Sequence, residues 1–248
     1  QLLDEKKDIN WTDIMKNIHM TSMENELVEQ YKNATNVDIR IRLHEKYSTN
    51  PVSWFTWLYD HYKIDETSQV LELGCGNGQL WNENRSRVKG HIYLSDISQG
   101  MINDASENLK DLNVQYYCFD CHHIPFDDES MDIIIANHLL FYLKDIDTVL
   151  KEIKRVLKPG GYFYCSTYGK NHMKEITELV KLYDPQITLS NVLLYEVFGL
   201  ENGADILKEY FHTVDKDVYE DSLEVTHMDD IANYILSCHG NQSEYISK

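Results

Sequence analysis

The chain has 248 residues, of which 42% are hydrophobic and 26% charged, and its formal net charge is −18. This composition is that of a globular protein, and the excess of acids disfavours a nucleic-acid partner, whose phosphates call for a basic surface. No apolar run approaches the roughly 20 residues that span a bilayer, so we expect no membrane partner.

Three regions of the chain differ in their pattern. Residues 1–65 have helical periodicity, and we expect them to form an N-terminal helical lid or extension. Residues 66–248 are expected to form the main domain, with an insertion around residues 169–210. The first region also carries an aromatic group that either packs in a core or lines a pocket, and packing is the commoner role at helical spacing. Its members are Trp54, Phe55, Trp57, Tyr59 and Tyr62.

Short β-rich runs alternate with amphipathic helical stretches in the middle of the chain. The expected strands are residues 69–73, 91–95, 114–119, 132–136 and 162–166. Helices are expected to begin near Gln79, Ser98 and Asp145. This alternation predicts a Rossmann-like α/β fold, a doubly wound and mostly parallel sheet with helices on both faces. In such a sheet a ligand binds beyond the carboxyl ends of the strands.

A glycine-rich loop follows the first expected strand. Residues 72–78 read ELGCGNG, and Gly74, Gly76 and Gly78 permit a sharp turn that lets backbone approach a ligand. In dinucleotide-binding loops the third glycine comes three residues after the second, whereas here it comes two after. The loop therefore fits the amino-acid end of a ligand better than a pyrophosphate. An NAD(P)-dependent dehydrogenase becomes a less favoured alternative.

Polar side chains stand at the ends of the expected strands. Glu72 lies one residue inside the end of the first strand, and Asp96 ends the second, where an acid would bind ribose hydroxyls. Asp120 ends the third strand and could accept a hydrogen bond from the exocyclic amine of adenine. Asn137 and His138 follow the fourth strand and face the same crevice. Together these positions indicate a ligand that contains a nucleoside.

Five cysteines are scattered along the chain, at positions 75, 118, 121, 165 and 238. The first ten residues lack the pattern of a secretory signal, so we expect reduced thiols and a cytoplasmic protein. Residues 118–122 read CFDCH, which matches a haem-attachment pattern and, with His123, resembles a metal cluster. Such attachment needs an exported chain, and no second Cys/His pair stands at zinc-finger distance. We therefore expect no metal.

These motifs, in order and spacing, resemble those of class I S-adenosylmethionine-dependent methyltransferases. The closest resemblance is to the ubiquinone/menaquinone-biosynthesis branch, and it covers about residues 66–168. The motifs are ELGCGNG at 72–78, YLSDIS at 93–98, the run at 118–143 and RVLKPGGYFYCST at 155–167. The resemblance implies a seven-stranded sheet, completed by residues 211–214 and 223–226. Residues 42–50 more weakly resemble the helical lid that precedes this domain in some bacterial members.

The resemblance also implies a cofactor, S-adenosylmethionine, with S-adenosylhomocysteine as its product, and a set of contacts for it. These contacts are Glu72, Gly74, Gly76 and Gly78 near the methionine part, Asp96 on the ribose, Ile97 against one face of adenine, Asp120 and Cys121 at the adenine edge, and Asn137 beside the methionine amino group.

The expected activity is in-line methyl transfer to a small-molecule acceptor. Residues 136–141 read ANHLLF, in place of the Asn/Asp-Pro-Pro-aromatic turn that DNA amino-methylation usually involves. His138 is the best candidate for a general base, although a histidine that only lines the pocket is the commoner case; His44 is a second candidate. Residues 185–210 are expected on the acceptor side. The alternative function is a noncatalytic S-adenosylmethionine-binding or regulatory protein on the same fold.

Overall fold

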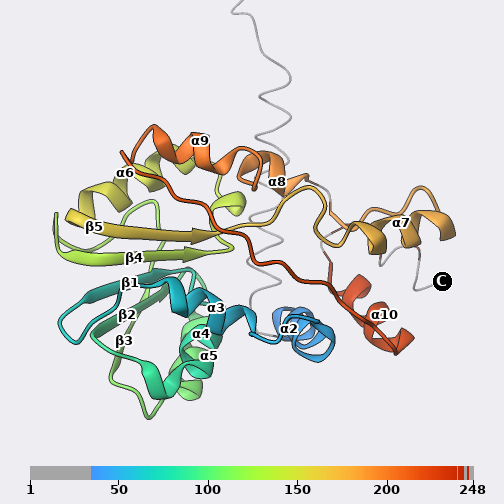
Figure 1. Cartoon of the computed structure of the whole chain (residues 1–248), viewed down its shortest axis with the longest axis horizontal. Coiled ribbons are helices and arrows are strands. Elements are labelled where there is room, and N and C mark those ends of the chain that lie inside the picture. Colours follow the sequence, from blue (N-terminus) through green and yellow to red (C-terminus); the bar gives the residue numbers. More distant parts are fainter. Residues whose placement is uncertain (1–34, 191, 239, 243–244, 246–248) are drawn as a thin grey trace, which may run out of the picture.

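The computed structural model of the chain describes residues 35–190, 192–238, 240–242 and 245. Residues 1–34 of the predicted N-terminal extension lie outside the described residues. The centre of the fold is a parallel sheet in the order β3-β2-β1-β4-β5 (Figure 1). Its strands are β1 (Gln69–Leu73), β2 (His91–Asp96), β3 (Val114–Cys118), β4 (Met131–Asn137) and β5 (Leu157–Ser166). The five predicted strands and the α/β class are confirmed.

Helices cover both faces of this sheet. The helices are α2 (Thr35–Tyr47), α3 (Trp54–His61), α4 (Gln79–Glu83), α5 (Gln99–Asn108), α6 (Ile146–Val156), α7 (Lys174–Tyr183), α8 (Leu194–Val197), α9 (Gly203–Lys208) and α10 (Met228–Leu236), with 3₁₀ turns η1 (Arg85–Arg87) and η2 (Leu140–Tyr142). One apolar cluster joins α3, α4 and α5 to the sheet, and a second joins α6, α8 and η2 to the opposite face. Among the described helices none has the length and apolar character needed to cross a membrane.

The central strands are buried on both faces, which explains their nearly continuous apolar sequence. Neighbouring residues of a strand point to opposite sides of a sheet. Val70 accordingly packs in the cluster of α3–α5, and Leu71 packs in the cluster of α6. In β4, Ile133 and Ile134 divide between the two clusters in the same way, and all four side chains are buried. The polar residues of these strands therefore lie near the strand ends, at the edges of the sheet.

Local capping explains where two of the helices begin. The Ser98 side chain accepts a hydrogen bond from Met101 N (3.3 Å), and the Asp145 side chain accepts one from Thr148 N (3.1 Å). Each bond satisfies a backbone donor that the first turn of a helix leaves without a partner. The starts predicted for these two helices are confirmed.

The sheet ends at β5, and the prediction of a seven-stranded sheet is wrong for the part of the chain that the structure describes. Residues 211–226, which contain both further predicted strands, run as an extended and largely exposed segment from α9 to α10 (Figure 1). Their backbone pairs elsewhere: Thr49 N donates to Ser222 O (2.9 Å), and Glu224 N donates to Tyr47 O (2.9 Å). Because residues 47–49 satisfy these backbone groups, the second predicted strand does not extend the sheet.

A third apolar cluster lies beyond the sheet and joins α2, α7 and α10 (Figure 1). Its buried side chains are Leu43, Tyr47, Ile176, Val180, Ile187, Tyr234 and Ile235. The Tyr47 hydroxyl also donates to Asp230 Oδ2 (2.5 Å). The two described helices of the predicted N-terminal extension therefore pack in different places: α3 lies on the sheet, whereas α2 lies against the C-terminal helix.

We expect Gly78→Ala to destabilise the fold. Gly78 has a φ of +79°, and a Cβ at this position would lie 2.7 Å from Cδ1 of buried Leu109. Left-handed backbone and overpacking together predict a loss of about 2–4 kcal/mol in the free energy of unfolding. Gly76→Ala is the matched control, because its φ is +54° but no atom lies within 4 Å of the added Cβ. Urea denaturation should show about half the loss for the control, and equal losses would contradict the packing argument.

Candidate functional site

The glycine loop turns sharply at the carboxyl end of β1 and is held there by Asp96. Gly74, Gly76 and Gly78 all have positive φ values, +69°, +54° and +79°. One Asp96 carboxylate oxygen accepts a hydrogen bond from Gly76 N (3.1 Å), and the other accepts one from Ser98 N (2.8 Å). Burial raises the pKa of this carboxyl, against the effect of these hydrogen bonds. The structure therefore brings the predicted loop and the predicted acid together.

Glu72 lies buried beneath this loop at the centre of the sheet. One of its carboxylate oxygens accepts a hydrogen bond from the Trp81 indole N–H (2.6 Å), and the other accepts one from Asn137 Nδ2 (3.4 Å). Desolvation by burial raises the pKa of Glu72 to about 7, although these two hydrogen bonds oppose the shift. Near neutral pH the group is therefore partly protonated.

Asn137 connects β4 to the N-terminal part of the chain. Its Nδ2 donates to the Tyr62 hydroxyl (2.9 Å), and that hydroxyl lies 3.3 Å from Asn137 Oδ1. Burial raises the pKa of Tyr62 above its ordinary value, so the phenol stays protonated. A polar network thus runs from Tyr62 through Asn137 and Glu72 to Trp81, across the switch point of the sheet between β1 and β4.

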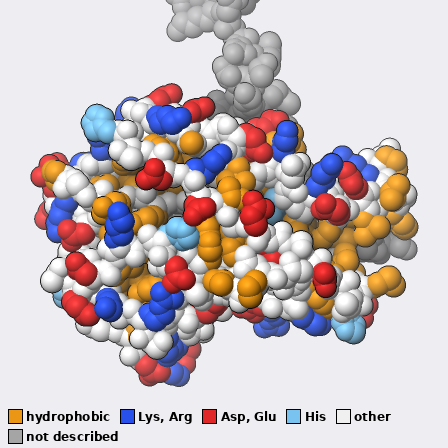
Figure 2. Space-filling view, in the orientation of Figure 1, with side chains coloured by type: hydrophobic (Ala, Val, Ile, Leu, Met, Phe, Trp, Pro, Cys, Tyr) orange, Lys and Arg blue, Asp and Glu red, His pale blue; other side chains and the backbone are white. Residues whose placement is uncertain are grey.

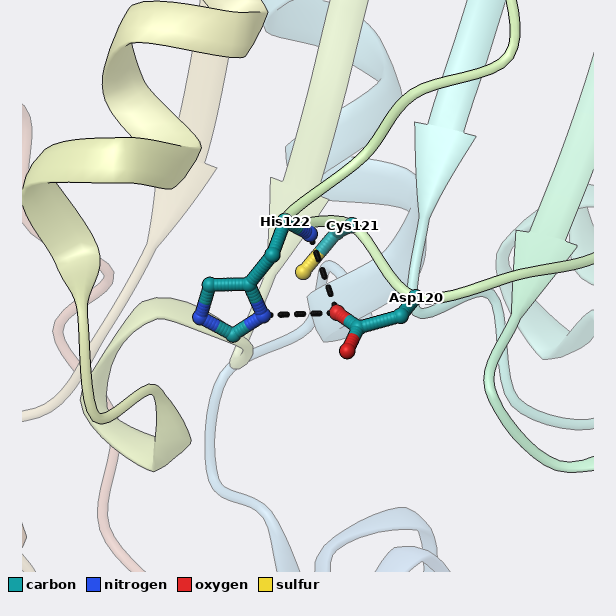
Figure 3. Close-up of side chains that lie close together, drawn as sticks. All are labelled: Asp120, Cys121 and His122. Carbon is teal, nitrogen blue, oxygen red and sulfur yellow. Dashed lines mark hydrogen bonds and ion pairs between the residues drawn. The ribbon is translucent and has the colours of Figure 1, made fainter.

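Asp120, Cys121 and His122 form a small cluster just after β3 (Figure 3). Asp120 Oδ1 lies 2.6 Å from His122 Nδ1 and also accepts a hydrogen bond from His122 N (2.9 Å). Burial raises the pKa of the Cys121 thiol to about 12. Ile97, at the end of β2, leaves 60% of its surface exposed. Both the cluster and Ile97 line the same cavity as the glycine loop.

His138 follows β4 in a backbone conformation that is uncommon for a residue with a side chain. Its φ is +49°, and its backbone N–H is held by Ser166 through the carbonyl oxygen (3.1 Å) and the hydroxyl (3.2 Å). The imidazole faces the cavity, where its ring centroid lies 5.5 Å from that of Trp54. Burial lowers the pKa of His138 to about 3, with smaller effects from neighbouring charges. His138 is therefore a neutral imidazole near neutral pH.

Two further histidines line the same cavity. The rings of His44, from α2, and His172, just before α7, are stacked with their centroids 6.0 Å apart. Burial lowers the pKa of both, that of His172 to about 4. Tyr168 lies between this pair and His138, with ring centroids 5.0 Å from His172 and 6.3 Å from His138. Three neutral imidazoles from distant segments thus share one wall.

The aromatic group of the N-terminal region both packs and lines the cavity. The ring centroids of Trp54 and Trp57 are 5.6 Å apart, and both rings pack on Tyr219 of the extended segment, at 5.2 and 5.5 Å. The ring of Trp54 also lies beside the imidazole of His138 in this wall. Packing in a core and lining a pocket are therefore both true of this group, because the rings that pack together also form part of the cavity wall.

One cavity of about 2870 Å³ is lined by most of these residues, although Gly78 and Trp81 are not part of its wall. It extends from the glycine loop and Asp96 past His138 to α2, α7 and residues 188–201. Ligand cavities of single small molecules usually measure about 300–1,000 Å³. The space is therefore large enough for a second molecule beside a nucleoside-containing one.

The structure brings the predicted site residues to one cavity, except Gly78, which does not line it. It adds three residues that sequence reasoning missed. Trp81 and His172 carried no signal, since neither stands at the end of a strand. Tyr62 was visible only as one of several aromatic residues. Tyr62 meets Asn137, and His172 stacks on His44, across large separations in the sequence. Trp81 lies only nine residues from Glu72, but its contact depends on how the turn after β1 folds.

Comparison with known proteins identifies the family of the central part of the chain. Residues 71–165 match the profile of a methyltransferase-domain family. This range runs from β1 to β5 and includes the glycine loop, Asp96 and the cluster after β3. Residues 71–165 are thus a methyltransferase domain, which confirms the resemblance inferred from the motifs.

Two curated proteins and one solved structure are similar to parts of the chain. The chain is 36% identical over 123 residues to a ubiquinone/menaquinone biosynthesis C-methyltransferase from Vibrio vulnificus. The aligned part covers 47% of this chain and 46% of the relative. The chain is 34% identical over 118 residues to a malonyl-[acyl-carrier protein] O-methyltransferase from Marinomonas, covering 46% and 43%. The chain thus spans about half the length of these curated relatives. An S-adenosylmethionine-dependent methyltransferase structure from Mesorhizobium loti is 22% identical, with a TM-score of 0.42, and covers 46% of this chain and 52% of that one.

The raised pKa of Glu72 predicts how stability depends on pH. Between about pH 4.5, where an unfolded Glu titrates, and about pH 7, the folded state holds a proton that the unfolded state has released. Ionisation of Glu72 therefore destabilises the fold as the pH rises through this window. From about pH 5.5 to about pH 8, the wild type should lose about 2 kcal/mol of unfolding free energy relative to Glu72→Gln.

Parallel urea denaturation of the two proteins across this pH range measures the difference, because all other titrations cancel. A difference that stays constant with pH would show that Glu72 is already ionised in the folded state at low pH.

Proposed function

We propose that the protein binds S-adenosylmethionine at the carboxyl edge of its sheet and transfers the methyl group to a small-molecule acceptor in the adjoining cavity. The observation that carries this proposal is the convergence of the glycine loop, Asp96 and Asn137 on one end of a cavity with room for a second molecule. The methyltransferase-domain match to residues 71–165 supports the same conclusion.

Several features of the site fit this cofactor. Glu72 and Asp96 place two carboxyls of raised pKa at one end of the cavity, and a nearby cation would favour their ionised forms. The cofactor offers such cations in its ammonium and sulfonium groups. The space above Gly76 is open, which lets backbone approach the methionine part. Exposed Ile97 offers an apolar surface that a flat base would cover.

The assignment of residues to parts of the cofactor rests on the family resemblance, and all of these residues except Gly78 line the cavity. The proposed contacts are Glu72, Gly74, Gly76, Gly78 and Asn137 for the methionine part, Asp96 for the ribose hydroxyls, Ile97 for a face of adenine, and Asp120 and Cys121 for its edge.

Methyl transfer of this kind requires mainly that the acceptor is aligned with the methyl group and the sulfur. The cofactor supplies a methyl group that its positive sulfur has already activated. The protein then has to hold the acceptor in line and exclude water, and such positioning is worth roughly 7–11 kcal/mol of the barrier. His138 faces the cavity as a neutral imidazole and is the proposed base for an acceptor O–H or N–H. Its pKa of about 3 makes it a weak base until bound ligands change its surroundings. A general base of this kind contributes about 10²–10⁴-fold.

A small-molecule acceptor fits the surface and the cavity better than a nucleic acid does. The formal net charge is −18, and the face in Figure 2 intersperses acidic and basic side chains without a continuous basic area. The predicted acceptor side, residues 185–210, contributes Leu193, Leu194 and Phe198 to the cavity wall. Two relatives carry names that describe quinone biosynthesis and a malonyl-carrier substrate.

Asp96→Ala should weaken S-adenosylhomocysteine binding by roughly 1.5–3 kcal/mol, because a buried charged hydrogen-bond partner of the ribose is lost. Isothermal titration calorimetry measures this affinity. Glu107→Ala, which removes an exposed acid of α5, is the matched control and should bind as the wild type does. Since Asp96 also holds Gly76, the thermal unfolding of both variants should be recorded. Unaltered affinity in a folded Asp96→Ala protein would refute the ribose contact.

His138→Asn should lower turnover by about 10²-fold or more while cofactor affinity changes less than about twofold, if His138 is the base. Asn suits this test because it tolerates positive φ better than Ala does. The assay follows S-adenosylhomocysteine formation over a panel of acceptor metabolites, with His123→Asn as control. Unchanged turnover would remove His138 from the mechanism. Cofactor binding by the wild type with no product from any acceptor would favour the noncatalytic alternative.

A further inference from the structure

Three different metal-binding donors meet in the turn after β3. A carboxylate oxygen of Asp120, the sulfur of Cys121 and a ring nitrogen of His122 all lie within 4.8 Å of one another (Figure 3). The turn is already formed, since the backbone N–H of His122 donates to Asp120 Oδ1 (2.9 Å). Bringing the three donors to one ion therefore needs only small side-chain rotations.

We propose that Asp120, Cys121 and His122 form a binding site for a divalent cation of the zinc type, with an open coordination position. Oxygen, sulfur and nitrogen donors together suit zinc, whereas magnesium and calcium take oxygen ligands. Three protein ligands leave the fourth position of a tetrahedral zinc ion for water or another ligand.

The cation would bind where Asp120 and His122 now share a hydrogen bond. Asp120 Oδ1 and His122 Nδ1 lie 2.6 Å apart with a proton between them. When the ion binds His122 through Nδ1, the ring proton moves from Nδ1 to Nε2, and the Cys121 thiol proton passes to solvent. The bonds formed are one each to oxygen, sulfur and nitrogen, at roughly 2.0–2.3 Å. The acidic surface of the protein raises the local concentration of cations.

The three donors that meet in the structure differ from those of the C-x-x-C-H pattern in one residue. Cys118 is exposed and its sulfur lies 3.5 Å from the Ile97 carbonyl oxygen, while His123 is exposed and outside the cluster. The first cysteine of the pattern therefore takes no part, and Asp120 takes its place. This difference supplies matched controls for the test.

The site lies in the wall of the cavity, where the edge of adenine is proposed to bind. We therefore expect the cation and the cofactor to exclude each other, which makes the cluster an inhibitory site. This consequence rests on the proposed function, whereas the binding of the cation itself does not.

Titration of the purified chain with cadmium, followed by thiolate-to-metal charge-transfer absorption, tests the site. The wild type should bind one equivalent, and Cys121→Ser and His122→Asn should each bind roughly tenfold more weakly or worse. Cys118→Ser and His123→Asn should match the wild type within about twofold. No absorption band in the wild type, or a band that survives Cys121→Ser and is lost in Cys118→Ser, would overturn the proposal.

A second measurement separates the cation site from the proposed function. One equivalent of zinc should weaken S-adenosylhomocysteine binding to the wild type at least tenfold, and should leave binding to His122→Asn unchanged. If zinc binds and S-adenosylhomocysteine does not bind at all, the cation site stands and the proposed cofactor is wrong. Equal affinity for S-adenosylhomocysteine with and without zinc would overturn the inhibitory role.

Discussion

Burial of β1 and β4 on both faces is the constraint on which the remaining structure depends. Helices take up the apolar side chains on either side, so the polar residues of these strands lie toward the strand ends. Gln69 and Asp132 lie at the amino ends, and Glu72 and Asn137 lie near the carboxyl ends. The strand order reverses between β1 and β4, and the loops that follow them diverge to opposite faces there. The cavity, the glycine loop and the network around Glu72 all lie at this opening.

Buried acids give this edge its chemical character. Glu72 and Asp96 sit where desolvation opposes their ionisation, and each is held by donors from the loop or from the neighbouring strand. Such an edge attracts a ligand that carries positive charge. The opposite wall is built from neutral imidazoles and packed aromatic rings, which favour an uncharged or flat partner. The cavity therefore has two chemically distinct ends, as a reaction between two bound molecules requires.

Much of this arrangement could be predicted because it is local. Alternating apolar runs fixed the five strands, and Ser98 and Asp145 marked two helix starts through hydrogen bonds that span three residues. Residues 211–214 and 223–226 misled the prediction because their composition suits a strand. The backbone of Ser222 and Glu224 found partners in residues 47–49, more than 170 residues away, and no local pattern carries that choice. His172 went unnoticed for the same reason, since the ring that stacks on it belongs to His44, far away along the chain.

The sequence by itself determined the fold class, the glycine loop and the acids at successive strand ends. These depend on periodicity and on the geometry that any parallel sheet imposes. Only the tertiary structure decided which pKa values shift, which aromatic rings form the cavity wall and which of the donors near residue 120 meet. Burial and side-chain direction arise when distant segments pack together. The one-dimensional pattern C-x-x-C-H therefore includes Cys118, which lies outside the cluster, and omits Asp120, which belongs to it.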